Sequence, residues 1–240
     1  MTRLDKRFDE TDDRVGAPIG DAPGSQTNEA EGETTSIYLP PFRIDVTVRP
    51  GTIHLTSRNR VATAVRAALE AAGAPGPASI GVVLSGDAEL AQLNAAHMGA
   101  TGATDVLSFP FFPPEAFPNH ERGVDPQRDP WVAAALKQAF ALPPGLRAHL
   151  GDIIVSVERA IAQAADGRGG QTGDVQWTPV EELLLLAVHG TLHVCGWDHA
   201  EPVEEAAMRA REQQVLASLP HHYGHAGHDG TDAAGAVETK

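Results

Sequence analysis

Three closely spaced histidines, His189, His193 and His199, constrain the fold of this chain more than any other feature of its sequence. The helix that carries the first two has a clear beginning, because Thr178-Pro179-Val180-Glu181 combines a capping box with proline at the first helical position. On that helix His189 and His193, four residues apart, project from one face. Gly196 ends the helix, since glycine readily adopts the left-handed conformation, and the turn lets His199 return toward the other two. The segment HGTLHVCGWDH therefore predicts three imidazoles that converge on one metal ion.

The donor set indicates which metal this would be. Three neutral nitrogen ligands suit zinc best, although nickel, copper and iron also accept imidazole. Three protein ligands leave a fourth position open, which is typical of catalytic zinc and makes hydrolysis at neutral pH feasible. We therefore expect one zinc ion per chain, held by His189, His193 and His199. The C-terminal tail could bind a second metal loosely, so zinc is best counted on a chain that ends near Leu219; the tail histidines are His221, His222, His225 and His228.

The spacing of the three histidines also resembles that of metzincin proteases. In those enzymes the first histidine is followed by a glutamate that acts as general base. Here that position is Gly190. A zinc metallopeptidase is therefore an alternative, weakened because the usual proton acceptor is missing.

Charge and composition exclude several other classes of protein. Eighteen Lys and Arg against 32 Asp and Glu give a net charge of −14, so any contact with nucleic acid must be local. The longest unbroken apolar run, Leu183 to Val188, is far shorter than the ~20 residues that span a bilayer. The charged N-terminus does not resemble a secretory signal, and Cys195 is the only cysteine. We expect a cytoplasmic protein with no membrane partner.

The chain divides into one folded domain and two tails. Residues 1–39 are predicted to be a disordered acidic arm, since the sequence shows no apolar periodicity before residue 36. The domain spans residues 40–220 and contains a proline-rich insertion at about 111–149. Residues 221–240 form a flexible tail that contains histidines.

Within the domain the hydrophobic pattern changes repeatedly between strand and helix. Strands are predicted at Arg43–Val48, Ser79–Leu84, Asp105–Phe109 and Leu150–Ser156. Helices are predicted from Ser57 to Gly73, from Asp87 as the capping residue, over Val157–Ala165, and from Pro179 to about Cys195. Because strands and helices do not alternate regularly, we expect the α+β fold class rather than a doubly wound α/β sheet.

Several motifs together resemble one known family. HGTLHVCGWDH looks like the H-G-x-L-H-L-x-G-x-D-H signature of the YbeY family of metal-dependent endoribonucleases in bacterial ribosomal RNA maturation. Thr104 to Pro110 is similar to the T-D-V-L-S-F-P of that family, and Leu150 to Ile153 resembles its L-G-D-I strand. Met208 and Glu212 match the helix that follows the metal motif. The likeness extends from about Ile44 to Leu219.

The resemblance implies a zincin-like single domain of the α+β class, with a small mixed β-sheet flanked by helices. It also implies one zinc ion on His189, His193 and His199. It further implies a single-strand-specific endoribonuclease that acts in 16S rRNA 3′-end maturation and ribosome quality control. Its partners would be rRNA precursors and the small ribosomal subunit, with no DNA. The residues that act beside the metal, and those that bind substrate, stay unassigned.

One position departs from the pattern of the family. Many members have an arginine six residues before the threonine of T-D-V-L-S-F-P, whereas this chain has Met98. Either the activity is diminished or another cation serves. A basic stretch could hold a single-stranded RNA backbone, although a solvated surface explains it equally well; its residues are Arg43, Arg49, Arg58, Arg60 and Arg66. Met98 also motivates a further alternative, a non-catalytic factor that associates with the ribosome.

Overall fold

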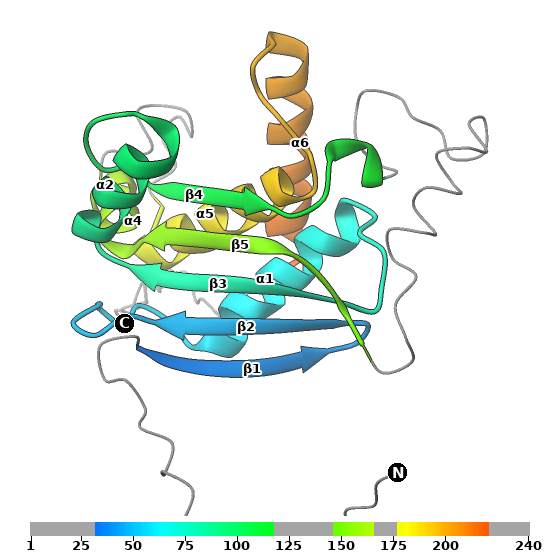
Figure 1. Cartoon of the computed structure of the whole chain (residues 1–240), viewed down its shortest axis with the longest axis horizontal. Coiled ribbons are helices and arrows are strands. Elements are labelled where there is room, and N and C mark those ends of the chain that lie inside the picture. The colour runs from blue at the N-terminus through cyan, green and yellow to red at the C-terminus, as the bar shows by residue number, and fades with distance from the viewer. Residues whose placement is uncertain (1–31, 118–145, 166–176, 221–240) are drawn as a thin grey trace, which may run out of the picture.

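The central feature of the protein is a five-stranded mixed sheet (Figure 1). The structure is a computed structural model that describes residues 32–117, 146–165 and 177–220. The strand order is β1-β2-β3-β5-β4, in which β2, β3 and β5 are parallel and the two edge strands are antiparallel to their neighbours. The strands are β1 (Glu33–Leu39), β2 (Phe42–Val48), β3 (Ala78–Ser85), β4 (Val106–Pro110) and β5 (Ala148–Ser156).

Alternating apolar residues explain how the sheet joins the core. In β2 the side chains of Ile44 and Val46 are fully buried, whereas Asp45 between them is half-buried. Ile44 lies opposite Ile80 of β3, and Val82 of β3 lies opposite Ile153 of β5. These pairs form a continuous apolar layer beneath the helices.

The described residues form five helices and two short helical turns. The helices are α1 (Arg58–Ala71), α2 (Asp87–Leu93), α4 (Val157–Ala165), α5 (Pro179–Val194) and α6 (Pro202–Ser218), and the turns are the π-helix η1 (Asn94–Met98) and the 3-10 helix η2 (Pro114–Ala116). Helices α1 and α5 pack on one face of the sheet and contact each other, and α6 projects beyond the β4 edge (Figure 1). None of the described helices combines the length and the apolar character that crossing a bilayer requires.

Helix α5 is the best-defined element of the predicted site. Thr178 Oγ1 accepts a hydrogen bond from the Glu181 backbone, and the Glu181 carboxylate accepts one from the Thr178 N–H, so the predicted capping box is present. The run from Leu183 to Val188 is buried on every side, as expected of a helix enclosed between a sheet and other helices. The helix therefore has a fixed position against β4 and β5.

The structure confirms the α+β class and the small mixed sheet flanked by helices. Two details were wrong. The acidic arm does not extend to residue 39, because Glu33–Leu39 pairs with β2 as an edge strand. Asp87 is the first residue of α2, and Gly86 occupies the capping position. The rest of the arm, residues 118–145 of the insertion and the tail from 221 lie outside the described residues.

Candidate metal centre

The three histidines lie in a cleft of about 890 Å³. Residues of β4 line one side of the cleft, and residues of α5, α6 and the loop between these helices line the other. Asp105 and Ser108, both in the segment that resembles T-D-V-L-S-F-P, line the cleft, and so does Met98. The structure thus brings the T-D-V-L-S-F-P segment and the histidine segment together.

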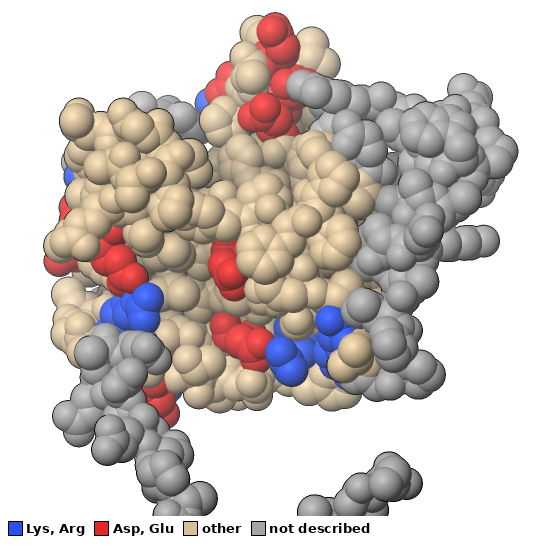
Figure 2. Space-filling model, in the orientation of Figure 1, with Lys and Arg blue, Asp and Glu red and all other residues tan. Residues whose placement is uncertain are grey.

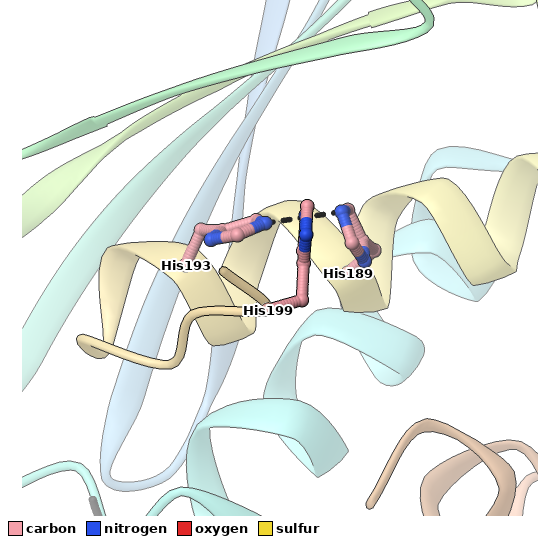
Figure 3. Close-up of side chains that lie close together, drawn as sticks. All are labelled: His189, His193 and His199. Carbon is pink, nitrogen blue, oxygen red and sulfur yellow. Dashed lines mark hydrogen bonds between the residues drawn. The ribbon is translucent and has the colours of Figure 1, made fainter. Parts of the chain in front are cut away.

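The imidazoles of His189, His193 and His199 point toward one another (Figure 3). One ligand nitrogen from each ring lies within 4.8 Å of the other two. The Nε2 atoms of His189 and His193 are 3.1 Å apart, because a spacing of four residues on α5 places the two rings one above the other. The convergence predicted from the spacing is present in the structure.

The turn after α5 carries His199 to the cluster. Gly196 has a φ of 84°, the left-handed conformation predicted for it, and its N–H donates to the His193 carbonyl. The N–H of Trp197 donates to the Leu192 carbonyl, which closes the turn. Asp198 Oδ1 accepts a hydrogen bond of 2.8 Å from the His199 N–H, so this carboxylate fixes the backbone of the third histidine.

A carboxylate from α6 orients the first histidine. Glu212 Oε1 lies 2.6 Å from His189 Nδ1, and the Glu212 side chain is 6% exposed. With a carboxylate as acceptor, Nδ1 carries the proton and donates, which leaves the lone pair of Nε2 directed at the other two rings. This partner is the usual support of a histidine that binds a metal.

The second histidine of the cluster favours the uncharged imidazole. Burial, followed by the proximity of His189 and His199, lowers the pKa of His193 to about 4. His193 is therefore neutral at pH 7, the form in which an imidazole binds a metal.

The donor set fits a single metal ion. Zinc–nitrogen bonds of about 2.0–2.1 Å in a tetrahedral site place two ligand nitrogens about 3.3 Å apart. The observed separation of 3.1 Å between two of the three nitrogens is close to this value. The three rings could thus hold one ion while leaving a coordination position toward the cleft.

Gly190, which replaces the glutamate of metzincins, faces the sheet. A Cβ atom at this position would lie 2.8 Å from Val106 Cγ2, 3.2 Å from Ile153 Cγ2 and 3.3 Å from Ser108 Oγ. Ser108 Oγ also donates to the Gly190 carbonyl at 3.1 Å. The glycine therefore allows α5 to approach β4 and β5 closely, and a longer side chain has no space there.

We expect Gly190→Ala to lower the free energy of unfolding by about 1 to 2 kcal/mol. Overpacking against a stiff valine costs roughly 1–3 kcal/mol, and the better helix propensity of alanine returns up to about 1 kcal/mol. Urea unfolding measures the change. Val106→Ala removes the methyl group that the new Cβ atom would overlap. The double variant Gly190→Ala/Val106→Ala should therefore lose less stability than the sum of the losses of the two single variants. Strict additivity would show that this contact is not the cause.

Asp105 closes the end of the cleft near α4. Burial raises the pKa of this carboxyl, but hydrogen bonds from Gln163, Thr104 and the Val106 N–H outweigh burial, so the net pKa is below its ordinary value. Asp105 is therefore ionised at neutral pH, and it adds negative charge to the cleft.

The basic stretch predicted from the sequence does not reach the site. None of its five arginines lines the cleft. Four of them form ion pairs with acidic residues: Arg43 with Asp45, Arg49 with Glu89, Arg58 with Glu33 and Arg66 with Glu70. The charge of the fifth, Arg60, interacts with Glu181. Of the two interpretations, the solvated surface agrees better with the structure.

Sequence reasoning missed the part that α6 plays in the site. Glu205, Met208, Arg209 and Glu212 all line the cleft, and their spacing of three and four residues places them on one face of the helix. The spacing can be recognised in the sequence. However, a helix face that combines acidic, basic and apolar residues is not typical of a face that lines a metal site.

Fold and site together define a mixed α/β protein in which three clustered histidines could hold one metal ion in an open cleft. Residues 47–220 match the family model described as Endoribonuclease YbeY. The chain belongs to this family, which confirms the resemblance found in its motifs.

Curated relatives agree with this assignment. A protein of Roseiflexus sp. (strain RS-1), named Endoribonuclease YbeY, is 34% identical over 177 residues, which are 73% of this chain and 92% of the relative. Proteins of the same name from Moorella thermoacetica and Salinispora tropica are 35% and 38% identical and cover 69% and 66% of this chain, and 86% and 85% of their own lengths. A solution structure of TM1509 from Thermotoga maritima aligns over 74% of this chain and 88% of that chain, with 19% identity and a TM-score of 0.39.

Proposed function

We propose that this chain is a single-strand-specific endoribonuclease that uses one zinc ion held by His189, His193 and His199. The observation that carries the proposal is the convergence of three ligand nitrogens within 4.8 Å, in a protein of the Endoribonuclease YbeY family. Zinc bound there would polarise a phosphate oxygen of the RNA and stabilise the charge that develops when the phosphodiester is attacked.

The side chains of the protein prepare the site for this chemistry. Glu212 holds the proton of His189 at Nδ1, so that Nε2 stays available. Asp198 fixes the loop that carries His199. The cleft is open to solvent next to the rings, since His199 is exposed, so an extended strand could reach the histidines from solvent.

The biological substrate is a proposal that rests on the family. We propose rRNA precursors as substrate, with roles in 16S 3′-end maturation and ribosome quality control, and the small ribosomal subunit as partner in the cytoplasm. A chain with a net charge of −14 is repelled by RNA at long range, so binding would depend on groups inside the cleft.

An RNA cleavage assay with and without a chelator tests the proposal. We expect zinc-loaded protein to cut an unstructured RNA and to leave a perfect duplex and casein intact. The activity should disappear after treatment with EDTA and dialysis, and return when zinc is added. The reason is that the zinc ion supplies the positive charge that stabilises the attacked phosphodiester.

Two results would contradict the proposal. Cleavage of casein without loss of RNA would favour the metallopeptidase. Binding to the small subunit with no RNA cleavage, in both the wild type and His189→Ala, would favour the non-catalytic factor.

A further inference from the structure

The charges in the cleft are strongly unbalanced. Four carboxylates line it, on Asp105, Asp198, Glu205 and Glu212. Among the described residues of the lining, Arg209 is the single arginine or lysine. Acidic side chains also gather on the part of α6 that projects beyond the sheet (Figure 2). A polyanion that enters the cleft therefore meets repulsion from these carboxylates, and Arg209 is the one arginine or lysine among the described residues of the lining that opposes it.

Arg209 is placed close to the histidine cluster by the geometry of α6. It precedes Glu212 by three residues, which is about 4.5 Å along the helix axis. Glu212 contacts His189, and Arg209 lies within one helical turn of Glu212 on the face of α6 that lines the cleft. A phosphate beside the one held at the histidines would lie within reach of an arginine side chain from this position.

The Arg209 guanidinium is held in place by one ion pair, which leaves several of its N–H donors available. Arg209 Nη2 donates to Glu205 Oε1 at 2.5 Å, one turn earlier on α6, and the arginine side chain is 46% exposed. A guanidinium has five N–H donors arranged as a planar fork that matches the oxygens of a phosphate. The pair with Glu205 uses one of these donors and holds the side chain along the helix, which leaves the others for a ligand in the cleft.

We propose that Arg209 binds a backbone phosphate of the single-stranded RNA, next to the phosphate that is cleaved. This inference rests on the proposed function and extends it by naming a substrate-binding residue. Glu205 acts as a positioning residue that keeps the guanidinium over the cleft before the RNA enters. Charge-assisted hydrogen bonds of this kind are strong, and they do not depend on the identity of the base.

The test is the cleavage of a labelled unstructured RNA by the zinc-loaded full-length chain at several salt concentrations. For Arg209→Ala we expect KM to rise about tenfold, because a charge-assisted contact to phosphate is lost, while kcat changes by less than about twofold. The slope of log(kcat/KM) against log salt should become shallower by about 0.7, the value for one phosphate contact on a single strand. Arg209→Lys keeps the charge, so it should restore the salt slope and part of KM.

Arg66→Ala provides a matched control. Arg66 forms the same kind of pair with Glu70, four residues away on α1, and the exposed fractions of the two side chains, 41% and 45%, match the 46% and 45% of Arg209 and Glu205. It does not line the cleft, so KM and the salt slope should equal those of the wild type. If Arg209→Ala also equals the wild type in a protein that cuts RNA, the inference fails and the proposed function stands. If the wild type does not cut RNA, both fail.

Discussion

His193→Ala is expected to remove the metal ion and to lower the rate of RNA cleavage by about a thousand-fold. A metal ion contributes several kcal/mol to stabilising the charge of the transition state, and each ~1.4 kcal/mol corresponds to a factor of ten in rate. The substitution leaves two imidazoles, and the remaining pair cannot enclose an ion as the three converging nitrogens can. Cleavage of a labelled single-stranded RNA and the zinc content of the dialysed protein measure the two effects.

His54→Ala is the control for a general effect of losing a histidine. His54 is exposed and lies in a loop outside the cleft, so its replacement should change neither zinc content nor cleavage. The four histidines of the tail are present in both variants and add the same background to each measurement. A His193→Ala protein that keeps one tightly bound zinc ion and full activity would rule out the assignment of the metal centre.

The metal ligands could be predicted from the sequence because every signal that places them is local. The capping box at Thr178 defines the beginning of α5, the interval of four residues sets the relative position of His189 and His193, and Gly196 turns the chain. Each signal acts over a few residues and depends little on the rest of the fold. The same reason explains why β2, β3, β5, α1 and α4 were placed within a few residues of their observed bounds.

The contacts that complete the site join residues far apart in the chain. Glu212 follows His189 by 23 residues, and Ser108 precedes Gly190 by 82. No local sequence pattern indicates that these residues meet, because their contacts depend on how α6 and β4 pack around α5. The packing role of Gly190 was likewise unpredictable, because its small size is required by Val106 and Ile153 of the sheet, which are distant in the sequence.

The N-terminal edge strand shows a different limit of sequence reasoning. In β1 the half-buried positions include Ile37 and Leu39, whereas Glu33 and Thr34 are exposed. A strand that packs on one side only needs few apolar residues, and its stability comes from pairing with β2. An acidic segment with such a weak pattern reads as disorder until its partner strand is known.

The arginines of residues 43–66 look like a basic stretch in the sequence partly because two of them have acidic partners far away in the chain. Glu89 follows Arg49 by 40 residues, and Glu33 precedes Arg58 by 25. A net charge counted over a short stretch of sequence thus overestimates the basic surface, because it leaves out acidic partners that lie elsewhere in the chain. In the cleft, charge counted over a short stretch instead hides a basic residue. Arg209 has glutamates near it on α6, so the local sequence gives no indication of a phosphate contact.

Glu212→Ala is expected to weaken zinc binding by about 10- to 100-fold, the usual effect of removing a carboxylate that orients a ligand histidine. The variant loses the acceptor that lies 2.6 Å from His189 Nδ1, so the His189 ring can rotate and change its tautomer. Glu212→Gln should lose less, because the amide oxygen still accepts a hydrogen bond from Nδ1 although it carries no charge. Competition with a chromophoric chelator at pH 7 gives the zinc affinity of each variant.

Saturating zinc separates this positioning role from that of a ligand. Glu212→Ala retains all three histidines, so a large excess of zinc should restore most of its RNA cleavage, whereas His193→Ala should stay inactive at the same concentration. Glu70→Ala is the control, because Glu70 is a partly exposed glutamate paired with Arg66 on α1, far from the cleft lining. If Glu212→Ala bound zinc as tightly as Glu70→Ala, the carboxylate on α6 would have no part in holding the metal, and His189 would have to be oriented by its packing in α5 alone.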